Sequence, residues 1–143
     1  MNLYQQQKHQ QQEIINEFLK QYAFFAFSDA QFKEGLQAMG ITEQEAPAAL
    51  VSFGAAGYIR REYADQLKEI LAQPIRERAA ALADPETGPQ FAFDMFLYEL
   101  NNHEYSWTGD TGEALEALGY SFDDVAADPV LSEALKRAEA AAR

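Results

Sequence analysis

Residues 89–105, PQFAFDMFLYELNNHEY, leave a helix almost no polar face, and this run limits the possible folds more than any other part of the chain. Pro89 suits the first turn of a helix, where its missing backbone donor costs little. Apolar side chains follow on every side, and Asp94 and Glu99 are the main polar interruptions. A helix that is apolar all round is buried. The sequence therefore predicts a buried central helix over 89–103.

Three other stretches, 10–26, 62–83 and 129–142, space their apolar residues as helices do, and we expect them to wrap the central helix. Pro74 lies inside the second stretch and must kink it or split it in two, because proline removes a backbone donor and clashes with the preceding turn. The fold class expected is a mostly α, compact helical bundle.

The least helical part is VSFGAAGYIRRE, in which Gly54 and Gly57 flank two alanines between β-prone residues. We interpret residues 51–61 as one short β-hairpin or irregular loop. Two other segments, 33–45 and 112–124, align without gaps, and each contains a helix, a glycine stop and a capped restart.

The chain has 143 residues, of which 48 % are hydrophobic and 13 % aromatic, so one folded domain with a real core is expected. We place that domain at 13–143, after a polar, Gln-rich extension at 1–12. Cysteine is absent, which excludes disulfides and thiolate chemistry and fits a reducing compartment. Since the sequence has neither a secretory signal pattern nor a long apolar run, we expect a cytoplasmic protein.

Net charge is −12, and its distribution is uneven. Residues 79–135 contain twelve acidic residues and no Lys or Arg, whereas the rest of the chain has eleven of each sign. Such a field repels nucleic acid and attracts basic partners. The alternative interpretation is a solvated acidic surface that only keeps the protein soluble. Direct nucleic-acid binding and membrane binding are not expected.

The residues predicted to contact a partner lie in the acidic stretch and include the only Trp of the chain. They are Glu104, Asp110, Glu113, Glu116, Asp123, Asp124 and Trp107. A competing interpretation of this region is structural, with Tyr105 and Trp107 anchoring the chain on the core after the central helix ends.

The GAAGYIRR loop offers a second hypothesis, a small protein that binds and sequesters a nucleotide signal. Gly54 and Gly57 would let the backbone approach a phosphate, Arg60 and Arg61 would bring charge, and Tyr58 would stack on a base. No phosphate-binding glycine motif is present. The same two arginines could instead pair with the acidic half, within one molecule or across a homodimer.

A third hypothesis is a metal-dependent hydrolase built on Glu99 and His103, which share one face of a helix because they lie four residues apart. This pair supplies at most two ligands, and the far more specific HExxH motif is absent. With only two histidines and no cysteine, we expect no enzyme, no cofactor and no metal.

Four segments, FFAFSDAQFKEGL, FGAAGYIRRE, FDMFLYELNNHEYSWTGD and EALEALGYSFDDV, resemble a family of small uncharacterised acidic proteins found on conjugative elements and phages of Gram-positive gut bacteria. The resemblance covers roughly residues 20–137 and leaves out the Gln-rich start and the Ala-rich end. It implies a mobile-element origin, where small acidic proteins often counter host defence. The leading expectation is therefore a non-enzymatic inhibitor that blocks a basic nucleic-acid-binding surface of a nuclease or other defence effector.

Overall fold

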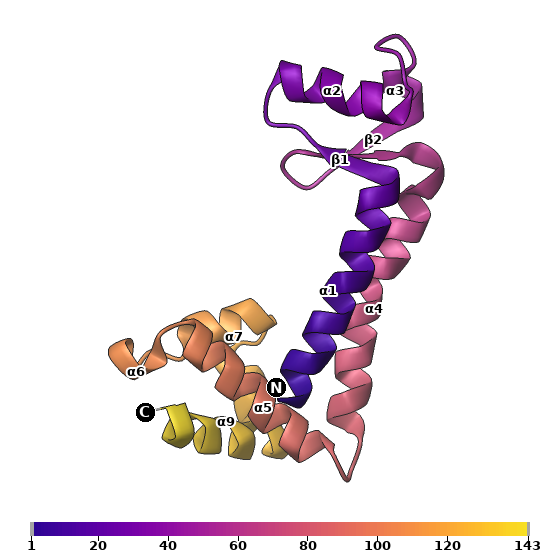
Figure 1. Cartoon of the computed structure of the whole chain (residues 1–143). Helices are drawn as coiled ribbons and strands as arrows, with labels where there is room; N and C mark the ends of the chain where they lie inside the picture. Colours follow the sequence, from indigo (N-terminus) through magenta and orange to yellow (C-terminus); the bar gives the residue numbers. More distant parts are fainter. Residues whose placement is uncertain (1, 143) are drawn as a thin grey trace. The chain divides into compact units, whose positions relative to one another are not determined.

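The computed structural model describes residues 2–142, which are mostly helical and include a small three-stranded antiparallel sheet (Figure 1). The elements in chain order are α1 (Leu3–Tyr22), β1 (Ala23–Phe25), α2 (Asp29–Met39), α3 (Ala46–Ala49), β2 (Leu50–Phe53), β3 (Gly57–Arg60), the 3-10 turn η1 (Arg61–Tyr63), α4 (Ala64–Ala83), α5 (Gly88–Asn102), α6 (Tyr105–Thr108), α7 (Gly112–Leu118), α8 (Phe122–Ala126) and α9 (Pro129–Ala142). The expected mostly α fold and the expected hairpin are both confirmed.

The described residues form two compact units. Unit 1 contains residues 2–10 and 76–142, and unit 2 contains residues 11–75, so the division falls inside α1 and inside α4. This arrangement differs from the expected extension at 1–12 followed by one domain. The helical pattern marks where helices run, but it does not show which of their turns share a core. No helix within residues 2–142 is both long and apolar enough to cross a membrane.

The core of unit 1 is built around α5, which confirms the buried central helix. Met95, Phe96 and Leu100 are fully buried, and α9 lies along α5 with Ala134 and Ala138 in the contact (Figure 1). These small residues let the two helix backbones approach closely, as tight helix packing requires. Burying each large apolar side chain contributes roughly 1.5–3 kcal/mol.

Unit 2 has its sheet between two sets of helices. The strand order is β1-β3-β2, with Phe24 opposite Tyr58 and Val51 opposite Ile59. Phe24 and Tyr58 pack with Leu36 of α2, while Ile59 on the other face is 1 % exposed and packs with the last turns of α1 and the start of α4. Side chains alternate between the two faces because a strand has a period of two.

One local expectation is wrong, and one alternative of a second is excluded. Residues 23–25, AFF, were expected to continue the first helix, but they form β1, an edge strand that pairs with β3. Pro74 does not split α4, which runs as one α-helix from 64 to 83. Pro74 removes the donor that would bond the carbonyl of Ile70, and the boundary between the two units falls directly after Ile75.

Candidate functional site

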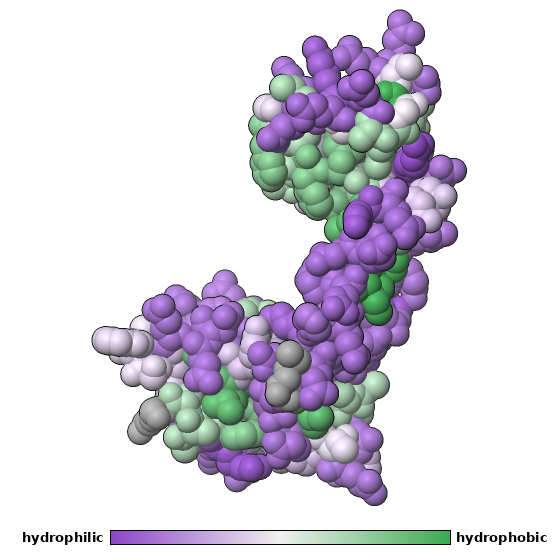
Figure 2. Space-filling view, viewed as in Figure 1, coloured by the Kyte–Doolittle hydropathy of each residue, from purple (hydrophilic) through white to green (hydrophobic). Residues whose placement is uncertain are grey.

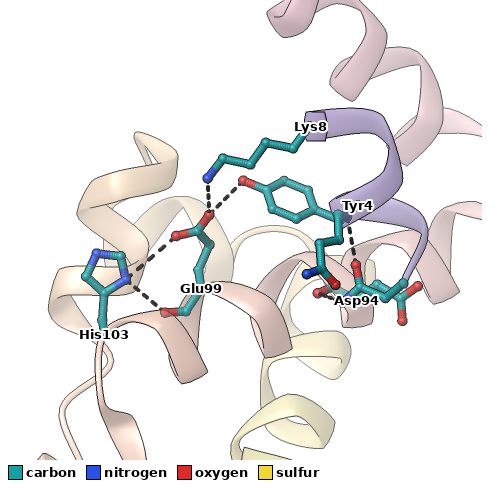
Figure 3. A network of polar contacts seen from close by, with 7 residues as sticks. Tyr4, Lys8, Asp94, Glu99 and His103 are labelled. Carbon is teal, nitrogen blue, oxygen red and sulfur yellow. Dashed lines mark hydrogen bonds and ion pairs between the residues drawn. The ribbon is translucent and has the colours of Figure 1, made fainter. Parts of the chain in front are cut away.

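Glu99 of α5 is the centre of a buried polar network in unit 1 (Figure 3). Its Oε1 accepts a hydrogen bond from the Tyr4 hydroxyl at 2.8 Å and an ion-paired bond from Lys8 Nζ at 3.1 Å. His103 Nδ1 lies 2.8 Å from the backbone oxygen of Glu99 and 3.6 Å from its Oε2. A carbonyl oxygen only accepts, so the proton of that bond is on Nδ1. Glu99 itself is 3 % exposed.

Asp94, the other polar interruption of α5, receives the start of α1. Its Oδ2 accepts from the backbone N–H of Leu3 at 2.9 Å, and its Oδ1 accepts from Gln90 Nε2 at 2.8 Å. Asn2 Nδ2 donates to the Asp94 carbonyl at 3.0 Å. A carboxylate at a helix N-terminus is favourable because the first N–H groups are otherwise unpaired and the helix dipole is positive there. Asp94 and Glu99 thus hold the first turns of α1 on α5.

The Glu99 network stabilises the packing of the first turns of α1 on α5. Burial, followed by the hydrogen bond to Glu99, raises the pKa of the Tyr4 hydroxyl above its ordinary value, so the hydroxyl stays protonated and donating. Every buried side-chain N or O atom in residues 2–142 has a hydrogen-bond partner. The structure brings Glu99 and His103 together as expected, but no set of three His, Cys, Asp or Glu within the described chain could hold a metal ion.

Tyr4 and Lys8 are contacts of the Glu99 network that the sequence interpretation missed, since both lie in the supposed extension. Tyr4 is 8 % exposed, its ring meets Phe91 edge-on at 6.0 Å, and Lys8 lies over the Tyr98 ring at 5.1 Å. A usable signal exists: Tyr4 and Lys8 are four residues apart, so they extend the inner stripe of the helix into the Gln-rich segment.

The arginines of the GAAGYIRR loop hold unit 2 together. Arg60 Nη2 donates to the carbonyl of Met39, the last residue of α2, and Arg61 donates to three carbonyls of residues 47–50 at 3.0–3.3 Å. Cationic side chains are favourable at the carbonyl end of a helix. The arginines were expected to be solvated, to face a phosphate or to pair with the acidic half. Arg61 is exposed and Arg60 is half-buried, and both also bond backbone carbonyls within their own unit.

The remaining loop residues predicted to bind a ligand also serve packing. Gly54 occupies the hairpin turn with φ +57, and the Phe53 ring lies directly over Gly57. The ring of Tyr58 stacks on Phe24 with 5.4 Å between centroids. These contacts place Gly57 and Tyr58 on opposite faces of β3.

The helices α6, α7 and α8 carry the residues predicted to contact a partner, and we call this region, residues 104–128, the α6–α8 surface. All six predicted acids and Trp107 are exposed, and the visible face of α6 and α7 is largely hydrophilic (Figure 2). Of the twelve acids in 79–135, ten are exposed and only Asp94 and Glu99 are buried. No base interrupts this stretch.

Two of the six acids also shape the backbone. Asp124 Oδ2 accepts from the Ser121 backbone N–H at 2.9 Å, while Ser121 Oγ accepts from the Asp124 N–H at 3.0 Å, which is a capping box. The Ser121 backbone bond lowers the pKa of Asp124, so this carboxylate stays ionised. Asp110 Oδ1 accepts from the Gly112 N–H at 2.8 Å and precedes α7.

Charge differs between the two units. The sequence of unit 1, counted over 1–10 and 76–143, has fourteen acids and six bases, a formal charge of −8. Residues 11–75 have nine acids and five bases, a formal charge of −4. The acidic surplus is therefore a property mainly of unit 1, and its exposed part is concentrated where no base lies nearby in sequence.

Fold and charge together define a small, α-rich acidic protein. The base-free character of residues 79–135 belongs to the sequence, since Arg78 of α4 reaches the end of α7 and donates to the Leu118 carbonyl at 3.0 Å. The chain belongs to a family of unknown function, DUF7659, whose model matches residues 3–140. This match reaches beyond the expected 20–137 at both ends, so it includes Tyr4 and Lys8. Neither a curated protein nor a solved structure matches the chain.

Proposed function

We propose that this protein is a non-enzymatic binding protein whose α6–α8 surface covers a basic, nucleic-acid-binding surface of another protein. The observation that carries the proposal is the run of ten exposed acids in residues 79–135 without a single base. A nuclease or another defence effector is the expected partner, in keeping with the resemblance to acidic proteins of conjugative elements and phages. Inhibition then requires only that the protein occupy the nucleic-acid-binding surface of its partner, without a catalytic step.

Electrostatics gives this interaction a recognisable signature. A field of one sign accelerates encounter with a basic partner and repels nucleic acid that competes for the same surface. Exposed charge pairs are screened within about 8–10 Å at physiological ionic strength, so the complex weakens as salt is added.

The test is a pull-down from host lysate with tagged protein, washed at low and at high salt, comparing the wild type with two charge reversals. Glu113→Lys changes the α6–α8 surface. Glu34→Lys is its matched control, because Glu34 occupies the same position in the aligned segment of α2 and is also exposed.

We expect a basic, nucleic-acid-handling protein that is retained at low salt and released at high salt. Glu113→Lys should weaken its retention, whereas Glu34→Lys should not. Equal retention at both salt concentrations, or equal loss in both variants, would contradict the proposal, because the contact would then not depend on this surface.

A further inference from the structure

Trp107 is 89 % exposed, more than any other large apolar side chain in residues 2–142. It is also the only Trp of the chain. Tyr105, two residues earlier, is 4 % exposed and packs in the core of unit 1. The expected anchoring role therefore falls to Tyr105 alone, and the helical turn directs the two rings to different sides.

The backbone around Trp107 is closely specified at both ends. Glu104 starts α6 with φ +59, the only positive φ of a non-glycine residue in the described chain, and Gly109 ends it with φ +67. The Trp107 N–H donates to the Glu104 carbonyl at 2.9 Å, and the Gly109 N–H donates to the Tyr105 carbonyl at 2.8 Å. A left-handed non-glycine residue costs on the order of 1 kcal/mol, so the display of Trp107 is maintained against strain.

Acidic residues flank this indole on both sides in sequence. Glu104 lies three residues before Trp107 and Asp110 three residues after it, and both are exposed. An exposed aromatic residue flanked in sequence by acidic residues combines the two features of a nucleotide, a stacking plane and a negative charge. Single-stranded nucleic acid is recognised by this combination, through basic grooves in which bases stack on aromatic side chains or on arginine.

Resting on the proposed function, we infer that Trp107 occupies a base-stacking position on the partner, and that the partner is a protein that binds single-stranded nucleic acid. The acidic residues complement a basic groove on the partner. The indole fits only a groove that also carries a side chain on which bases stack. A groove for duplex DNA offers no such platform, because duplex bases are stacked on one another. For that kind of partner the acids suffice and Trp107 is dispensable.

The test uses the complex captured at low salt and two competitors at equal phosphate concentration. One is a single-stranded oligothymidylate of about 15 nucleotides, and the other is a duplex of similar length. We expect the single strand to displace the protein and the duplex to do so far less. Trp107→Ala should weaken binding by about tenfold or more, and Trp107→Phe should retain most of it, since a base-sized stacking contact is worth roughly 1–3 kcal/mol.

Phe122→Ala is the matched control, because Phe122 is a second exposed aromatic residue of the α6–α8 surface, at 60 % exposure. It should bind as the wild type does. The indole is unique in the chain, so its fluorescence emission reports this site alone, and it should shift to shorter wavelength on binding.

Salt-sensitive binding with unchanged emission, or with Trp107→Ala equal to the wild type, would overturn the inference and leave the proposed function standing. Equal displacement by the duplex, or an equal loss in Phe122→Ala, would overturn it as well. Absence of any salt-sensitive partner would refute both.

Discussion

Tyr4 and Glu99 meet across 95 positions of sequence, and their hydrogen bond is the most consequential single contact of unit 1. Tyr4→Phe keeps the ring packing but leaves a buried carboxylate without one of its donors. We expect it to lower the free energy of unfolding by about 1–3 kcal/mol. Urea denaturation followed by circular dichroism measures this. Tyr98→Phe is the control: that ring also packs on Tyr4, but its hydroxyl is not part of the Glu99 network. Equal losses would show that removing either hydroxyl near this ring pair has the same cost, so the bond to Glu99 would not be the cause.

The raised pKa of Tyr4 predicts how the stability of the protein changes at alkaline pH. Folding raises the pKa of Tyr4, so the unfolded chain, with an ordinary tyrosine pKa near 10, releases this proton more readily. The stabilisation is therefore complete below about pH 10 and is lost as pH rises above it. Unfolding titrations between neutral and alkaline pH should give a steeper decline for the wild type than for Tyr4→Phe. Parallel declines would contradict the assignment.

Individual residues also show where sequence interpretation fails. The exposure of Asp110 and Glu116 was predictable, because charged residues seldom lie fully buried. The only signal for the burial of Tyr4 was its four-residue spacing to Lys8, because the polar residues 5–13 that follow it do not extend an apolar stripe. For Trp107 the sequence left two interpretations open, contact with a partner or anchoring on the core, and it did not indicate the left-handed conformation at Glu104.

Among the elements, α2 contains a glycine in its interior, Gly35, and the packing of this helix requires the absence of a side chain there. Gly35 lies under the Phe24 ring, and a Cβ there would meet ring carbons at 2.2–2.6 Å. An exposed Gly→Ala change normally stabilises a helix by about 1 kcal/mol. At Gly35 we expect the opposite, a loss of about 1–3 kcal/mol, because Phe24 is enclosed by Phe32 and Tyr58.

Thermal unfolding of Gly35→Ala would measure this loss. Ala38→Gly, at an exposed position of the same helix, serves as the reference for helix propensity alone and should cost about 1 kcal/mol. A melting temperature of Gly35→Ala above that of the wild type would show that the ring moves aside at no cost.

Helix ends were the most predictable elements because their signals are local. Gly40 and Gly119 both end their helices in the left-handed conformation, with φ +70 and +79, and in both the next residue bonds back to the same helix at 2.9 Å. This is the stop motif that the alignment of 33–45 with 112–124 predicts. Strand β1 lacked such a signal, because its three residues form a strand only through pairing with β3.

At the scale of the whole molecule, each of the two units has its own buried residues. We therefore expect two separable patterns of hydrogen-exchange protection. Phe96→Ala, which empties a fully buried site of unit 1, should lower stability by roughly 3–5 kcal/mol and release amides of α5 and α9. The amides of β3 should remain protected, and Ile59→Ala should give the reverse. Hydrogen exchange with mass spectrometry measures the amide protection of both units in each variant. Equal loss of protection in both units from either substitution would mean one cooperative core.

The division into units lay beyond sequence interpretation for a related reason. Composition and periodicity predicted the helical class and the buried α5, since those properties are carried by contiguous residues. The union of residues 2–10 with 76–142 depends on contacts such as Lys8 with Glu99, 91 positions apart, and no local pattern encodes them. The acidic surplus was visible in sequence, but the loss of Asp94 and Glu99 from its exposed part was not.

The discontinuity of unit 1 has a consequence during synthesis. Residues 2–10 emerge from the ribosome before all of unit 2, and their partners at 94 and 99 emerge after it. Unit 2 is one uninterrupted stretch, and it is fully synthesised before Glu99, the partner of Tyr4, has been added to the chain. Unit 1 therefore completes its fold late, when residues 2–10 pack against residues from 76 onwards. In a chain interrupted before residue 94, Tyr4 and Lys8 lack Glu99 as a partner, so we expect residues 2–10 to be cleaved more readily there than in the full chain.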